Sequence, residues 1–99
     1  SNVACLSPAG AQRWYERMQT DLAGALEVEE RIFGFIRDSI VPYITEMGYS
    51  NAAVDKLLAA IGGWSDAGTK LRWPYDSIPQ EEAERLRPIA MAQMPELFA

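Results

Sequence analysis

Residues 21–48 read DLAGALEVEERIFGFIRDSIVPYITEMG, and they carry the clearest structural signal in the chain. Apolar side chains recur there at helical spacing with charged ones mostly between them, which is the pattern of an amphipathic helix. The apolar positions are Leu22, Leu26, Phe33, Ile36, Ile40 and Met47. Pro42 lacks the backbone N–H that a helix uses, so we expect a kink or a break near Val41.

Three further segments show helical patterning on either side of this stretch. They read PAGAQRWYERMQ over 8–19, AAVDKLLAAIGG over 52–63 and SIPQEEAERLRPIAMAQMPELF over 77–98. Oxygen-bearing side chains stand where each helix would begin and can accept its first unpaired N–H groups. These expected caps are Ser7, Thr20 or Asp21, Ser50 or Asn51, and Ser77 paired with Gln80. The expected helix ends are Gly48, Gly62 with Gly63, and Pro95.

The length of the chain sets the number of domains. With 99 residues and 48% hydrophobic content, the chain is sized for one domain with one core. No alternating apolar and polar run of useful length predicts a strand. We therefore predict an all-α fold over residues 1–99, built from four or five amphipathic helices.

Composition argues against several functional classes. Fourteen acidic residues outnumber nine basic ones, so the chain lacks the concentrated basic surface that binding to nucleic acid needs. The absence of histidine removes the commonest transition-metal ligand and the commonest general base. Cys5 is the single cysteine and cannot form an internal disulfide, which fits a reducing compartment. We expect no nucleic-acid partner and no metal.

Hydropathy gives an expected location. No apolar run approaches the roughly 20 residues of a membrane helix, and no signal peptide is recognisable. We therefore expect a cytoplasmic protein without a membrane partner. The chain begins at Ser1 rather than methionine, which leaves open processing, a tag remnant at Ser1 and Asn2, or membership of a longer protein.

The segment GTKLRWPYDSIPQEE, over 68–82, combines basic, aromatic and proline residues. Lys70, Arg72, Trp73 and Tyr75 could grip a nucleic-acid strand by charge and stacking. The acidic balance of the chain argues against that role. The favoured interpretation is a packing link, in which the aromatic rings are buried between helices and the prolines stiffen the connection.

No set of side chains in the sequence predicts an active site. Two acidic runs, Glu27, Glu29 and Glu30 in one and Glu81, Glu82 and Glu84 in the other, lie on helices where neighbouring side chains diverge, so each is interpreted as a solvated face. Cys5 has no histidine to activate it as a nucleophile. Lys56 and Lys70 are expected to reach solvent from a helix and from the link. We predict no catalytic, cofactor-binding or metal-binding residue.

Four of these segments, taken in order, resemble the C-terminal part of the dihydrodipicolinate synthase and N-acetylneuraminate lyase family. They are SNVA over 1–4, DLAGALEVEERI over 21–32, GYSNAAVDKLLAAIGG over 48–63 and GTKLRWPYDSIPQEEAERLRP over 68–88. In that family, an SNVA-like sequence follows the eighth barrel strand, and the other three match two helices and the link to the last helix. The resemblance covers nearly the whole chain.

The resemblance implies a parent enzyme with a (β/α)8 barrel, in which a lysine forms a Schiff base with a 2-keto acid. It implies no metal or organic cofactor. A barrel needs roughly 250 residues, so residues 1–20 would be the end of the last strand and the final barrel helix, and residues 21–99 a helical appendage. The family's lysine and tyrosine lie upstream of Ser1, and Lys56 matches only a structural lysine, shifted by one place.

Two departures from the family pattern leave the parent's substrate open. The segment 32–50 is longer than in dihydrodipicolinate synthases, and GYSNAAV replaces their usual turn. Both features resemble the sugar-acid dehydratase and other aldolase branches. The implied reaction is therefore a lyase reaction of unspecified substrate.

Three functional hypotheses follow. The first is a lyase segment, inactive alone, that supports oligomers; its exposed apolar helix faces would associate with each other or with the missing barrel. The side chains expected at that interface are Phe33, Phe35, Ile36, Ile40, Leu57 and Ile61. The second is a free-standing helical interaction or regulatory module, expected to be a compact monomer that buries these side chains. A helix-turn-helix regulator over 51–73 is a third and weaker alternative, because the charge is acidic.

Overall fold

A computed structural model describes residues 2–64, 68–71 and 76–98, and every regular element within those ranges is helical. The elements are α1 (Asn2–Leu6), α2 (Pro8–Thr20), α3 (Leu22–Phe35), a π-helical segment (Ile36–Ile40), α4 (Val41–Thr45), α5 (Asn51–Gly62), α6 (Gln80–Gln93) and a 3₁₀ turn (Pro95–Leu97), which we call the C-terminal turn. The prediction of an all-α chain is confirmed over these ranges.

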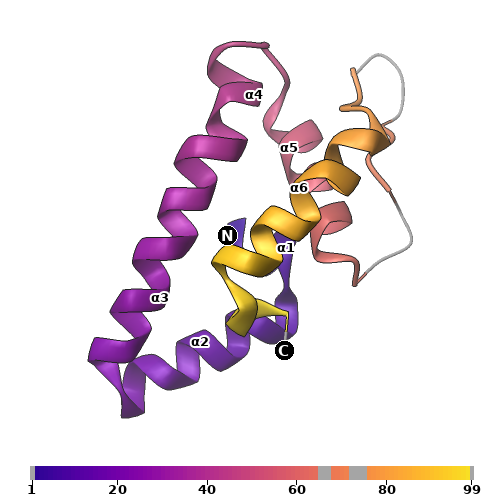
Figure 1. The fold of residues 1–99 in the computed structure, drawn as a ribbon. Coiled ribbons are helices and arrows are strands. Elements are labelled where there is room, and N and C mark those ends of the chain that lie inside the picture. The colour runs from indigo at the N-terminus through magenta and orange to yellow at the C-terminus, as the bar shows by residue number, and fades with distance from the viewer. Residues whose placement is uncertain (1, 65–67, 72–75, 99) are drawn as a thin grey trace.

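The helices form two arms, joined at the top of the view by the loop from α4 to α5 (Figure 1). One arm is α3, continued by the π-helical segment and α4, and α2 packs along its lower end. The other arm is α5, which contacts α1 on one side and α6 on another. The C-terminal turn brings the end of the chain back onto α2. The overall extents are 44 × 26 × 21 Å, so the molecule is elongated along the α3 arm.

The core lies between the two arms and takes buried side chains from α1, α3, α5 and α6, while α2 packs half-buried side chains against it. Its largest fully buried side chains are Leu6, Ile32, Phe35, Ile40, Leu57, Leu58, Ile61, Ile78, Leu86, Met94 and Leu97. In α5, Val54, Leu57, Leu58 and Ile61 are all buried, as their spacing at i, i+3, i+4 and i+7 predicts. Burial of this apolar surface supplies the main driving force for folding.

The apolar stripe that the sequence shows over residues 22–47 is not the face of α3 that packs into the core. Leu22, Leu26 and Phe33 are 58%, 49% and 57% exposed, and Met47 is exposed as well. The buried face is instead made by Ala25, Val28, Ile32 and Phe35, a second apolar stripe at i, i+3, i+7 and i+10. Because α3 is apolar on both faces, periodicity alone could not say which one faces the core.

The predicted break near Val41 takes the form of the π-helical segment. There the Val41 N–H donates to the Ile36 carbonyl five residues back. A proline at position 42 cannot donate, and its ring would press on the carbonyl four residues earlier, so the backbone widens just before it. The wider turn moves Ile40 into the core, where it is 1% exposed.

The expected helix caps are confirmed at three of four starts. Ser7 Oγ accepts the Gly10 N–H at 3.0 Å, Asp21 Oδ1 accepts the Gly24 N–H at 3.1 Å, and Ser50 Oγ accepts the Ala53 N–H at 3.1 Å. These bonds satisfy N–H groups that have no partner within the helix.

The fourth expected cap, Ser77 with Gln80, is wrong. The helix α6 begins at Gln80 after Pro79, and no side chain caps it. Ser77 Oγ instead accepts the Leu71 N–H at 2.6 Å, which closes the described part of the link. Trp73 and Tyr75, whose burial was predicted, lie outside the described residues.

The start of the chain forms a short helix over Asn2–Leu6. This helix packs on α5. The two helices approach each other closely at Gly62, where an added Cβ would overlap the Leu6 carbonyl group.

Candidate functional site

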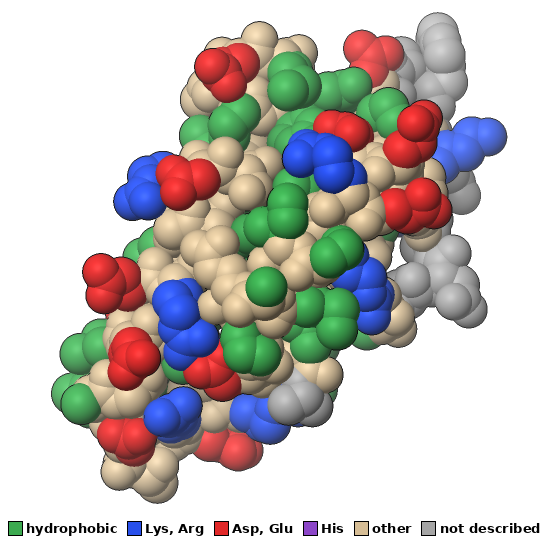
Figure 2. Space-filling model, viewed as in Figure 1, with side chains coloured by type: hydrophobic (Ala, Val, Ile, Leu, Met, Phe, Trp, Pro, Cys, Tyr) green, Lys and Arg blue, Asp and Glu red, His purple; other side chains and the backbone are tan. Residues whose placement is uncertain are grey.

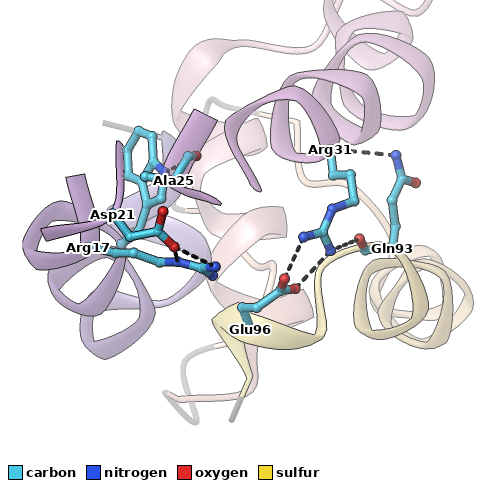
Figure 3. A network of polar contacts seen from close by, with 7 residues as sticks. Arg17, Asp21, Ala25, Arg31, Gln93 and Glu96 are labelled. Atoms are coloured by element: carbon cyan, nitrogen blue, oxygen red, sulfur yellow. Dashed lines mark hydrogen bonds and ion pairs between the residues drawn. The ribbon is translucent and has the colours of Figure 1, made fainter. Parts of the chain in front are cut away.

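A polar network joins α3 to the end of the chain (Figure 3). Arg31 on α3 forms a two-pronged ion pair with Glu96 in the C-terminal turn, and its Nη1 lies 2.8 Å from Glu96 Oε1. Arg31 Nη1 also donates to the Gln93 carbonyl at 3.2 Å, and Gln93 Nε2 donates to the Arg31 carbonyl at 3.2 Å. The hydrogen bond from Arg31 lowers the pKa of Glu96, which keeps the carboxylate charged.

A second group of contacts ties α2 to α3 on the same side of the molecule. The indole N–H of Trp14 donates to the Ala25 carbonyl at 3.0 Å. Arg17 donates to Asp21 Oδ2 at 3.2 Å, and Asp21 also caps α3. The pKa of Asp21 is lowered, first by the Gly24 N–H and then by Arg17. Trp14 and Asp21 therefore fix the angle between the two helices.

A pocket of 240 Å³ lies between these two groups of contacts. It is lined by Gly10, Arg13, Trp14 and Arg17 from α2, Val28 from α3, and Glu96 and Leu97 from the C-terminal turn. The four α2 residues stand at i, i+3, i+4 and i+7, which places them on one helix face. A Cβ on Gly10 would come within 2.6 Å of the Leu97 carbonyl oxygen, so glycine allows the C-terminal turn to sit against α2.

A third polar cluster joins α4 to α6. The Tyr43 hydroxyl donates to Glu82 Oε1 at 2.6 Å, and Arg85 Nη2 donates to the Tyr43 oxygen at 3.2 Å. Burial raises the pKa of Tyr43, and the hydrogen bond from Tyr43 lowers the pKa of Glu82. Each group has a partner from the other helix, so the cluster serves as a structural connection.

The outward face of α3 carries three large apolar side chains that do not pack into the core. We call Leu22, Leu26 and Phe33 the outer patch; they are spaced at i, i+4 and i+11 and are each about half exposed. Figure 2 shows acidic, basic and apolar side chains interspersed over the visible face, with some of the apolar ones at its edge along the α3 arm. Apolar side chains aligned on one helix face are typical of a surface that packs against another element.

The structure disperses the acidic residues that the sequence singled out. Among the described residues, no group of three or more His, Cys, Asp or Glu side chains could hold a metal ion. Glu82 has a structural partner in Tyr43, and the neighbouring Glu81 and Glu84 are exposed on α6. Glu27 and Glu30 are exposed on α3 and Glu29 is half-buried.

The nucleophile candidates are also separated. Cys5 is half-buried on α1, and burial, followed by the charge of Asp55, raises the pKa of its thiol. A raised thiol pKa leaves less of the reactive thiolate. Lys56 is half-buried on α5 and Lys70 is exposed in the link.

The pocket and the Arg31–Glu96 pair were not predicted from the sequence. Arg31 and Glu96 are 65 residues apart and belong to no local motif. The available signal was the i, i+3, i+4, i+7 spacing of Gly10, Arg13, Trp14 and Arg17, but nothing in the sequence placed the chain end against that face.

Comparison with known proteins adds no family. No family model, no curated protein and no solved structure matches the chain. Within the described ranges, no helix has both the length and the apolarity to cross a membrane.

Proposed function

We propose that this chain is the C-terminal helical part of a Schiff-base lyase similar to the dihydrodipicolinate synthase and N-acetylneuraminate lyase family. Its role would be to support assembly, while the catalytic lysine lies elsewhere in the parent protein. The observation that carries the proposal is the outer patch on α3, because the opposite face of the same helix already fills the core. A helix that is apolar on both faces is suited to a place between two packed layers.

The order of the helices supports the same proposal. The elements α2, α3, α5 and α6 fall where the resemblance places the final barrel helix and the three helices after it. Gly63 ends α5 in the left-handed conformation, with φ of 69°, before the link begins.

A free-standing interaction module is the second candidate, and a specific observation favours it. Of the six side chains expected at an interface, Phe35, Ile40, Leu57 and Ile61 are buried in the chain's own core and Ile36 is half-buried. That burial is expected of a self-contained domain. Phe33 alone of the six is exposed. The reading frame upstream of Ser1 separates the candidates, since a lysine-bearing barrel strand there supports the lyase segment.

The outer patch leads to a prediction about association. We expect the isolated chain to form a dimer or a higher oligomer at micromolar concentration, because covering Leu22, Leu26 and Phe33 removes apolar surface from water. Phe33→Glu should shift the equilibrium to monomer by placing a charge in the contact. Sedimentation equilibrium measures the change directly.

Ile89→Glu provides the matched control for this experiment. Ile89 is also an exposed apolar side chain, at 43%, but it lies on α6 rather than α3. This variant should associate like the unmodified chain. A clean monomer that also fails to bind the hydrophobic dye ANS would contradict the assembly role and support the self-contained module.

The lyase proposal also predicts where Schiff-base chemistry does not occur. Treatment with pyruvate and borohydride should leave Lys56 and Lys70 unlabelled, because Lys70 is exposed and Lys56 only half-buried, so neither amine is held in a dry pocket. The intact parent protein should be labelled once, at a lysine outside this chain. Mass spectrometry reads both outcomes, and stoichiometric labelling of Lys56 or Lys70 would place the chemistry within this chain.

A further inference from the structure

We propose that the pocket between α2, α3 and the C-terminal turn binds a small carboxylate that carries one aromatic or branched apolar group. The inference is independent of the lyase proposal. It rests on the shape of the pocket, on its apolar floor and on the balance of charge around it.

The floor of the pocket suits an apolar group. Val28 and Leu97 are 2% and 1% exposed and form part of the core, while Trp14 is half-buried and held in place by its hydrogen bond to Ala25. A ring of fixed orientation beside aliphatic side chains favours stacking by a planar group. At 240 Å³ the pocket is smaller than the roughly 300–1,000 Å³ of sites for drug-sized molecules, so one ring with a short acid arm is the expected size.

The charges around the pocket favour an anion. The pocket lining carries two guanidinium groups, those of Arg13 and Arg17, against one carboxylate, that of Glu96. The lining therefore carries one positive charge in excess, in a chain whose net charge is −5. Glu96 lines the pocket, but its two oxygens are already occupied by Arg31. Its negative charge is thus largely neutralised toward a ligand.

Arg13 is the residue placed to hold the carboxylate. Its Nη2 donates to the Glu96 carbonyl at 3.2 Å and to the Leu97 carbonyl at 3.5 Å, which positions the guanidinium at the pocket wall. Among the described residues it forms no ion pair, whereas Arg17 and Arg31 each have an acidic partner. These bonds use Nη2 and leave the Nε and Nη1 N–H groups for an oxyanion, in directions fixed by the planar fork of the guanidinium.

The test uses phenylacetate as the probe and phenylacetamide as its uncharged counterpart. Titration of the ¹⁵N-labelled 99-residue chain is followed at the indole N–H of Trp14, which Trp14→Phe identifies. We expect phenylacetate to shift this resonance, and Arg13→Gln to weaken binding about tenfold, the loss typical of one charge-assisted hydrogen-bond pair. Phenylacetamide should bind several-fold more weakly than phenylacetate.

Two further variants keep the result interpretable. Arg37→Gln removes the same charge from the π-helical segment, where Arg37 pairs with Asp38 and is exposed, and it should leave binding unchanged. Arg13→Lys keeps the charge without the fork and should fall between the unmodified chain and Arg13→Gln. Equal binding of the two probes, equal effects of Arg13→Gln and Arg37→Gln, or an unmoved Trp14 resonance would each overturn the proposal.

Discussion

Replacing Phe35 by alanine should lower the free energy of unfolding by about 3–5 kcal/mol, the usual cost of emptying a buried phenylalanine site. Phe35 is fully buried at the end of α3, where the π-helical segment begins. Domains of this kind have a total stability of about 5–15 kcal/mol, so the variant would keep only a marginal fold. Urea unfolding followed by far-ultraviolet circular dichroism measures the loss.

Phe33→Ala is the matched control, since it makes the same chemical change two residues away on the same helix. Phe33 is 57% exposed, so the stability of the monomer should change by no more than about 0.5 kcal/mol. The comparison is made at a concentration where the chain is monomeric, because Phe33 belongs to the outer patch. Similar losses in the two variants would show that the wrong face of α3 has been assigned to the core.

Gly62→Ala should destabilise the chain by about 3 kcal/mol, at the upper end of the range for overpacking. The added Cβ would overlap the Leu6 carbonyl group, which belongs to a backbone and cannot rotate away as a side chain could. Alanine is otherwise preferred to glycine in a helix by about 1 kcal/mol, so any net loss reports the close contact between α1 and α5. Separation of these helices should also disturb the indole N–H of Trp64, which donates to the Cys5 carbonyl at 2.8 Å.

Gly48→Ala separates this steric effect from backbone strain. Gly48 has a positive φ of 76°, yet no atom lies within 4 Å of the position that a Cβ would take. Only the cost of the left-handed conformation remains, about 1 kcal/mol. If Gly62→Ala costs no more than Gly48→Ala, then α1 is not held against α5 as the structure has it.

Local rules of helix formation were enough to predict most of the secondary structure. Ser7, Asp21 and Ser50 cap their helices because each supplies an oxygen next to unpaired N–H groups, and Gly63 ends α5 because glycine adopts positive φ without a side-chain clash. These effects depend only on residues within one helical turn. Ser77 does not cap α6, because its hydroxyl oxygen accepts the backbone N–H of Leu71, six residues earlier.

The faces of the helices and the candidate site depend on distant contacts, which local rules do not contain. Either face of α3 could have been buried, and the choice between Phe33 and Phe35 is made by the other helices. The pocket forms only when the C-terminal turn reaches Gly10, nearly the whole length of the chain away. Its charge balance likewise depends on the pairing of Arg31 with Glu96.

The π-helical segment before Pro42 has an evolutionary consequence, because a π turn accommodates one more residue than an α-helix of the same span. A relative with one residue fewer between Phe35 and Pro42 would run as continuous α-helix, and its counterpart of Ile40 would stay on the core face with Ile32 and Phe35. A single-codon deletion at this point would therefore remove the π turn and leave the faces of the helix before and after it unchanged. The length of this interval is the feature to compare first when homologous sequences are aligned.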